Sequence, residues 1–257
     1  MKYIPCKSAI SRSSLPGLKY TFNPYIGCRH GCLYCYVPDV LRWRVSKSGW
    51  GEYAYVKEGI LDRLRADLRR YPPGLIGVST VTDPYQPIER ELELTRQALT
   101  IIGSAGFTAS IQTKSPLVSR DLDVIRIHKF ELGMTITSLD DGFQRRFEPG
   151  ASPPEERAQV LEEASSMDIK TWIFYGPIIP GHNDSEGEMA AIVGLAKRTK
   201  SSILYDRLNL KPLMRIRLKG VLTPDGLRAV GEVDFTKIYY RLEALCRERG
   251  VKARYAF

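Results

Sequence analysis

The chain has few of the features that mark secreted or membrane-spanning proteins. It has only 5 cysteines in 257 residues, an odd number, and no stretch approaches the roughly 18 apolar residues of a membrane span. The first twenty residues mix lysines and arginine with prolines, where a signal peptide has a continuous apolar run. The sequence therefore predicts a cytoplasmic protein with reduced thiols. Cys6 and Cys246 are expected to be small, at least partly buried side chains.

Acidic residues are outnumbered by basic ones. The 38 Lys and Arg residues against 29 Asp and Glu give a formal net charge of +9. Such a charge suits a polyanionic partner such as DNA or RNA, because Lys and Arg neutralise phosphates. The basic residues are scattered along the chain, so a solvated basic surface explains the charge equally well.

The other three cysteines, Cys28, Cys32 and Cys35, form a Cys-x3-Cys-x2-Cys motif. Thiolates are soft ligands that select zinc, copper(I) or iron–sulfur clusters. A structural zinc ion usually takes four protein ligands, and no second Cys-x2-Cys pair supplies the fourth. A [4Fe-4S] cluster bound by three cysteines leaves one iron open to a small molecule. We prefer the cluster, and a zinc loop remains the alternative.

Strand-like and helix-like stretches alternate nearly end to end. Period-two patterns and β-branched or aromatic enrichment predict strands at residues 20–26, 75–81, 107–112, 132–137, 170–178 and 203–210. Apolar stripes predict helices around residues 60–68, 88–102 and 238–245. The run from Ser152 to Glu155 can form a capping box and predicts the start of another helix. A further helix is predicted to begin at Asp184 or Ser185.

This alternation predicts an α/β fold with a parallel sheet, because parallel neighbours need a long crossover connection. A closed eightfold barrel takes roughly 250 residues, and the first forty or so are used by a leader and the cysteine loop. We therefore expect an incomplete, open (β/α)6 barrel with an N-terminal leader and a C-terminal helix. A doubly wound open sheet is the alternative. The whole of 1–257 is expected to be one domain, with a core of about 20–210 and a C-terminal extension over 211–257.

Several motifs, in order, resemble one family over about residues 20 to 185. They are Asn23-Pro24-Tyr25-Ile26-Gly27-Cys28, Thr82-Asp83-Pro84-Tyr85-Gln86-Pro87-Ile88-Glu89, Thr113-Lys114-Ser115, Ser138-Leu139-Asp140, Phe147-Glu148-Pro149-Gly150 and Pro177-Ile178-Ile179-Pro180-Gly181. The cysteine loop resembles that of the radical S-adenosylmethionine (SAM) superfamily, and the wider pattern resembles its spore photoproduct lyase-like branch. The resemblance implies a [4Fe-4S] cluster, SAM as cofactor and an electron donor such as flavodoxin or ferredoxin.

The resemblance also implies roles for particular residues. The SAM contacts that it implies are Tyr34, Thr82, Asp83, Lys114, Ser138 and Arg157. Tyr34 is similar to the aromatic residue beside the adenine, and Tyr36 occupies a position where spore photoproduct lyases also have a tyrosine. Either tyrosine could relay a hydrogen atom. Reactive groups of barrel-like folds gather at the carboxyl ends of strands, where Thr82, Lys114 and Ser138 also fall.

The implied activity is reductive cleavage of SAM to a 5′-deoxyadenosyl radical that attacks a substrate. Nucleic acid is the expected substrate class, and a peptide or small metabolite is the alternative. A zinc-stabilised nucleic-acid-binding module without catalysis is the competing function. His30 and His182 are expected to face solvent, because neither has an evident carboxylate partner. Tyr53, Tyr55 and Tyr85 are candidates for base stacking, although packing is the commoner role of an aromatic.

One departure from the lyases bears on the reaction. Spore photoproduct lyases resembling this chain carry a hydrogen-donating cysteine shortly before a Ser-Asp pair at the end of the second strand. When Thr82 and Asp83 are matched to that pair, Thr80 occupies the donor position. We therefore expect that the chain does not repair spore photoproduct by the mechanism of those lyases.

Overall fold

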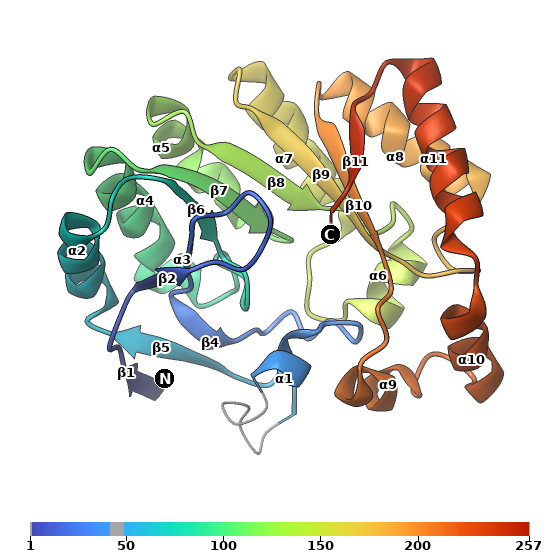
Figure 1. Ribbon diagram of the computed structural model, residues 1–257, viewed down its shortest axis with the longest axis horizontal. Coiled ribbons are helices and arrows are strands. Elements are labelled where there is room, and N and C mark those ends of the chain that lie inside the picture. Colours follow the sequence, from blue (N-terminus) through green and yellow to red (C-terminus); the bar gives the residue numbers. More distant parts are fainter. Residues whose placement is uncertain (1, 42–48, 257) are drawn as a thin grey trace.

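The computed structural model describes residues 2–41 and 49–256, which fold around a curved, eight-stranded sheet (Figure 1). A small three-stranded sheet lies beside it, in the order β1-β5-β4. The strands of the large sheet are β2 (Ile10–Arg12), β3 (Tyr20–Phe22), β6 (Leu75–Val78), β7 (Thr108–Thr113), β8 (Glu131–Thr135), β9 (Thr171–Ile178), β10 (Ser202–Arg207) and β11 (Ala253–Tyr255).

The large sheet has the topology of an open barrel. Its order is β11-β10-β9-β8-β7-β6-β3-β2, and every neighbouring pair is parallel except the antiparallel β2 and β3. From β3 to β10 the strands follow chain order without a reversal, whereas a doubly wound sheet reverses at a switch point. Within the described residues β2 and β11 remain edges and do not pair with each other. The expected open α/β barrel is confirmed.

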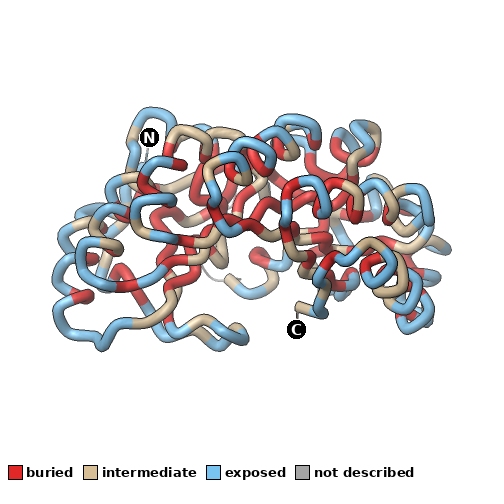
Figure 2. Tube along the Cα trace, turned by 90° about the horizontal axis from the view of Figure 1, so that it is seen from above, coloured by how far each residue is buried: buried red, intermediate tan, exposed pale blue. Residues whose placement is uncertain are grey.

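Helices cover the outer face of this sheet (Figure 1). The outer helices are α2 (Ile60–Arg70), α4 (Leu94–Ser104), α5 (Leu122–Ile127), α7 (Pro154–Ser166), α8 (Glu186–Arg198) and α11 (Phe235–Arg249). Ile111, Met134 and Ile173 point towards them and are fully buried. Figure 2 shows buried segments running through the middle of the molecule. No helix of the described ranges is long and apolar enough to cross a bilayer.

The prediction of one strand over residues 20–26 is wrong, because this segment forms two strands that belong to two different sheets. β3 ends at Phe22, and β4 (Tyr25–Gly27) pairs with β5 (Ala54–Glu58), which also pairs with β1 (Lys2–Pro5). Pro24 has no N–H for a ladder. The Asn23 side-chain oxygen accepts the N–H groups of Thr80 and Val81, both at 2.9 Å, which fastens the turn to the end of β6.

Two helix expectations also need correction. The helix expected over residues 88–102 is broken at Glu93, which has a φ of 49° and separates α3 (Glu89–Leu92) from α4. The Ser152 side chain does not cap α7, whose N-cap is Pro153 without a side-chain hydrogen bond. Ser185 does cap α8, since its hydroxyl accepts the Glu188 N–H at 3.1 Å.

Four shorter helices and a 3₁₀ turn complete the described chain. They are α1 (Val37–Val40), α6 (Asp141–Phe147), α9 (Pro212–Leu218), α10 (Pro224–Glu232) and the 3₁₀ turn η1 (Pro116–Asp121). α9 packs against α1, directly after the cysteine loop. The C-terminal residues return to the large sheet, where β11 pairs with β10.

Candidate cluster and cofactor site

The three cysteines lie on one loop between β4 and α1. Cys28 and Cys32 are buried, Cys35 is half-buried, and none forms a disulfide. Burial raises the pKa of all three thiols, that of Cys32 to about 12. Thiolates at these positions therefore need compensating positive charge, which bound iron supplies.

The donor set fits a cluster better than a single zinc ion. Thiolates around one zinc ion lie about 3.8 Å apart, because each Zn–S bond is about 2.3 Å. Within residues 2–41 and 49–256, no group of three or more His, Cys, Asp or Glu side chains could hold a metal ion. The cysteines of a cluster bind different irons and stand further apart. Three cysteines on one loop, in a sequence with no second Cys-x2-Cys pair, suit a cluster with one open iron.

The backbone of the cysteine loop is fixed by neighbouring elements. The Leu33 N–H donates to the Phe147 carbonyl, and the Gly150 N–H donates to the His30 carbonyl, both at 2.9 Å. A Cβ on Gly150 would lie 2.2 Å from the Arg29 carbonyl oxygen, so only glycine permits this approach. The Phe147–Gly150 motif therefore acts structurally, by holding the loop.

The expectation that His30 faces solvent is wrong. Its side chain is buried, and Nδ1 lies 3.3 Å from Oδ2 of Asp83. The partner comes from the loop after β6, so it could not be seen near His30 in the sequence. The exposed position expected for His182 is confirmed. Its ring packs edge-to-face with that of Phe147, with ring centres 5.3 Å apart.

The carboxylate of Asp83 is already hydrogen-bonded within the protein. Its oxygens accept the Tyr85 N–H at 2.9 Å, the Thr113 hydroxyl at 2.7 Å and the Lys114 N–H at 3.0 Å. Burial alone would raise its pKa, but His30 and these hydrogen bonds lower the pKa to about 2. These bonds leave little capacity for the direct SAM contact expected from the sequence. Asp83 instead joins the cysteine loop to the end of β7.

A second buried network holds Tyr34, between the second and third cysteines. Its hydroxyl donates to Glu148 and lies 3.1 Å from the Thr137 hydroxyl. Glu148 also pairs with Arg157 at 2.6 Å. Burial would raise the pKa of Glu148, but the positive charges of Arg157 and Lys114 and the Tyr34 hydroxyl lower it. Glu148 lies in one of the motifs that carry the family resemblance, but the sequence alone indicated no role for it.

Arg157 is buried, in contrast to an ordinary surface position on a helix. Its guanidinium donates to the Ser152 carbonyl through Nε at 2.9 Å and Nη2 at 2.5 Å, and to the Thr135 carbonyl at 3.1 Å. Together with the Glu148 pair, these bonds use most of its donors. Arg157 thus binds Glu148, which in turn holds the Tyr34 hydroxyl. Its expected contact with SAM stays a prediction.

The Glu148–Arg157 pair makes a prediction about stability. Glu148→Ala leaves a buried guanidinium without its carboxylate and should lower the free energy of unfolding by about 3–5 kcal/mol. Urea denaturation of the two proteins measures the difference. Glu162→Ala, which removes an exposed partner of Arg198, is the matched control and should cost less than about 1 kcal/mol. Equal losses in both variants would contradict the importance of this pair.

Lys114 is the cation that the protein leaves available. It follows β7, and its Nζ lies 5.5 Å from the centre of the Tyr34 ring. Burial lowers its pKa, but the negative charges of Cys32 and Glu148 outweigh burial and raise the pKa overall. In the part of the chain that the structure describes, Lys114 forms no ion pair within 4.0 Å. A desolvated ammonium beside the cysteine loop can accept an anionic ligand.

The remaining expected contacts lie around the same loop. The Thr82 hydroxyl donates to the Gly27 carbonyl at 2.5 Å, and the Ser138 hydroxyl accepts the Asp140 N–H at 2.9 Å. Tyr36 is 42% exposed, and its hydroxyl donates to the Thr80 carbonyl. The structure therefore brings the Tyr36 hydroxyl to the backbone of Thr80, the residue that the resemblance matches to the lyases' donor cysteine. The SAM roles of Thr82 and Ser138 stay predictions.

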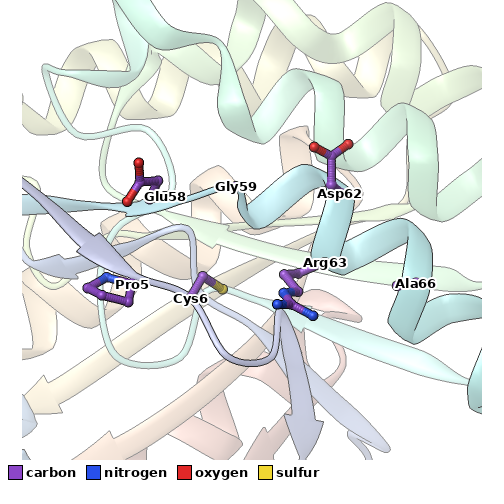
Figure 3. A pocket seen from close by; sticks show the side chains of 7 residues that line it. All are labelled: Pro5, Cys6, Glu58, Gly59, Asp62, Arg63 and Ala66. Atoms are coloured by element: carbon purple, nitrogen blue, oxygen red, sulfur yellow. The ribbon is translucent and has the colours of Figure 1, made fainter.

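Neither leftover cysteine reaches this loop. Cys246 is buried on α11, under the outer face of the sheet. Cys6 lines a surface cavity of about 460 Å³ beside α2, with Glu58 and Arg63 (Figure 3). Tyr53 and Tyr85 are buried, and Tyr53 packs against Tyr55 at 5.0 Å, so these residues serve packing.

Two other aromatic rings, those of Trp172 and Phe174 on β9, are half-buried and lie on the inner face of the sheet. Trp172 pairs in register with Gly133, and a Cβ on that glycine would lie 2.2 Å from the indole ring. Phe174 pairs with Thr135, two residues before the Thr137 that contacts Tyr34. Sequence reasoning placed this segment in a strand and did not single out either ring. The period-two pattern could have identified them, since Trp172 and Phe174 alternate with the core residues Ile173 and Tyr175.

These features define a class: an open α/β barrel with a three-cysteine loop fitted for an iron–sulfur cluster. A sequence model described as "Radical SAM superfamily" matches residues 22–192. The chain belongs to the radical SAM superfamily, whose cofactors are a [4Fe-4S] cluster and SAM.

Curated relatives share much of the chain. An uncharacterized protein of Methanocaldococcus jannaschii is 34% identical over 209 residues, which cover 81% of this chain and 77% of that protein. An uncharacterized protein of Acidianus two-tailed virus is 31% identical over 63% of this chain and 56% of its own length. These relatives carry no stated activity to transfer.

Solved structures share the fold. A spore photoproduct lyase complexed with dinucleoside spore photoproduct has a TM-score of 0.73 at 15% identity, covering 99% of this chain and 82% of the lyase chain. A radical SAM methyltransferase from Sphaerobacter thermophilus has a TM-score of 0.63 at 15% identity, covering 93% and 66%. Lyase and methyltransferase thus share this architecture, so the fold leaves the substrate open.

Proposed function

We propose that this protein is a radical SAM enzyme that binds one [4Fe-4S] cluster through Cys28, Cys32 and Cys35. A cluster held there would supply the electron for reductive cleavage of bound SAM, and the resulting 5′-deoxyadenosyl radical would abstract a hydrogen atom from the substrate. The observation that carries the proposal is the Lys114 ammonium beside the three-cysteine loop, 5.5 Å from the centre of the Tyr34 ring and without an ion pair among the described residues. Flavodoxin or ferredoxin is the proposed class of electron donor.

The residues of this chain have distinct parts in the proposal. Lys114 receives the SAM carboxylate, since its Nζ lies 5.5 Å from the Tyr34 ring, between the second and third cysteines in the chain, and the charge of Cys32 raises its pKa. The Tyr34 ring, held by Glu148 and Thr137, lies beside the adenine. Thr82 and Ser138 contact SAM from the ends of β6 and β8. Asp83 and Arg157 position these side chains through His30 and Glu148.

Lys114→Ala should weaken SAM binding by about 1–3 kcal/mol, because it removes a charge-assisted contact. Iron content should be nearly unchanged, since Lys114 is not an iron ligand. Equilibrium binding of SAM to reconstituted protein measures the effect. Lys197→Ala, in the last turn of α8, is the matched control and should bind SAM like the parent protein. Unaltered affinity in Lys114→Ala would mean that the carboxylate pocket lies elsewhere.

We propose nucleic acid as the substrate class. Two observations support it: the net charge of +9 and the half-buried rings of Trp172 and Phe174, on which a planar base can stack. A base within a duplex would first have to leave the stack, at a cost of a few kcal/mol. The test incubates reduced, SAM-loaded protein with deuterated oligonucleotides. Deuterium in 5′-deoxyadenosine supports the proposal, whereas transfer only from peptides or small metabolites contradicts it.

A further inference from the structure

The outer side of the cysteine loop is held by an arginine of α9. The Arg217 Nε donates to the Leu33 carbonyl at 3.2 Å, and its Nη2 donates to the Cys35 carbonyl. Asp39 of α1 accepts the N–H groups of Leu213 and Met214 at 2.9 and 3.2 Å. α1 and α9 therefore form one unit with the third cysteine, and Figure 1 shows them at one edge of the molecule, below the sheet.

The exposed surface of this unit combines positive charge with apolar side chains. We define the α9 surface as Lys211, Arg215, Ile216 and Lys219 together with Val40 of α1. Ile216 is 64% exposed and Val40 is 58% exposed, although both are large apolar residues. Within the described residues, no ion pair within 4.0 Å neutralises any of the three basic side chains.

Further positive charge lies on the other element that holds the loop. Arg145 and Arg146 are exposed at the end of α6, whose Phe147 carbonyl binds the Leu33 N–H. Arg146 donates to the Val221 carbonyl just beyond α9, at 3.2 Å, which joins α6 to this region. Basic side chains thus stand on both helices that hold the cysteine loop from outside.

We propose that the α9 surface docks the acidic electron-transfer protein that reduces the cluster. The inference rests on the proposed function and assigns its electron donor a site. Exposed basic side chains together with a few exposed apolar ones suit a short-lived complex with an acidic protein, because complementary charge speeds association and little apolar area is buried. The surface is joined to the Cys35 backbone through Arg217, so a protein docked there lies close to the cluster ligands.

The same features favour a protein over nucleic acid at this surface. Phosphate binding needs only the basic side chains, and it leaves the exposed Ile216 and Val40 without a role. A nucleic-acid substrate would also have to reach Trp172 and Phe174 on the inner face of the sheet, whereas α9 packs on α1 beside the cysteine loop.

The test compares two charge reversals in reconstituted holoenzyme. R215E/K219E alters the α9 surface, and R69E/R70E on α2 is the control with the same change in net charge. The probe is reduced flavodoxin, an acidic redox protein, and sodium dithionite is the small reductant. Flavodoxin affinity and the rate of cluster reduction are measured for each protein, with and without added salt.

The proposal expects R215E/K219E to lower flavodoxin affinity and flavodoxin-dependent reduction about tenfold or more, while reduction by dithionite and R69E/R70E stay at parent levels. Ile216→Ser should also weaken flavodoxin binding without changing reduction by dithionite. Equal effects of both reversals, no effect of either, or loss of oligonucleotide binding alone in R215E/K219E would overturn the proposal. Failure of the proposed function is distinguishable, because the parent protein would then form no 5′-deoxyadenosine even with dithionite.

Discussion

Cys32→Ala is expected to yield a protein without an intact cluster and without SAM cleavage. The variant removes one of three thiolate ligands, and no other cysteine of the described chain lies on the loop to replace it. Cys28→Ala and Cys35→Ala should behave in the same way. Iron and sulfide content and the broad visible absorption of each reconstituted variant measure the effect.

Cys6→Ala and Cys246→Ala are the controls. Cys6 lines the cavity beside α2, and Cys246 is a buried residue of α11, so both variants should assemble a full cluster. A Cys32→Ala protein with the iron and sulfide content of the parent would refute the ligand assignment. Loss of iron in the Cys6→Ala protein would show that the cluster uses a ligand set other than the loop.

Spore photoproduct is expected to remain unrepaired when it is incubated with reconstituted protein, SAM and reductant. When Thr82 and Asp83 are matched to the Ser-Asp pair of the lyases that this chain resembles, Thr80 occupies the position of their hydrogen-donating cysteine. A hydroxyl does not replace that thiol, because an O–H bond is far stronger than an S–H bond. Cys6 lines the cavity beside α2 and Cys246 is buried on α11, so we expect neither to substitute as the donor.

Tyr36 is the one group that challenges this expectation. Its hydroxyl donates to the Thr80 carbonyl, so a phenol lies beside the residue matched to the donor cysteine. The assay therefore uses the dinucleotide spore photoproduct with the parent protein and with Tyr36→Phe. We expect slow abortive SAM cleavage and no return to thymine in either protein. Efficient repair by the parent that is lost in Tyr36→Phe would overturn the expectation and assign the donor role to Tyr36.

The parts of the site that could be predicted are those that lie close together in sequence. Cys28, Cys32 and Cys35 are spaced as one motif on one loop. Period-two patterns located β7 and β8, and β-branched and aromatic enrichment located β9, each to within one or two residues. The break after β3 could also have been found, since Asn23-Pro24 is a turn signal and Pro24 has no N–H.

The parts that could not be predicted depend on contacts across the fold. Tyr34 and Glu148 are 114 residues apart in the chain, and their hydrogen bond exists only because α6 packs on the cysteine loop. The burial of His30 was not predicted either, because its partner Asp83 lies more than fifty residues further along the chain, after β6. No local pattern distinguishes the buried Arg157, which pairs with Glu148 at the end of α6, from an exposed arginine on a surface helix.

The central claim is that the cysteine loop holds a cluster that cleaves SAM. The most direct measurement is anaerobic reconstitution, followed by metal analysis and detection of 5′-deoxyadenosine after addition of SAM and dithionite. The proposed function predicts about four irons with sulfide per chain and formation of 5′-deoxyadenosine that requires SAM. One zinc ion per chain, with no iron uptake and no 5′-deoxyadenosine, would contradict it.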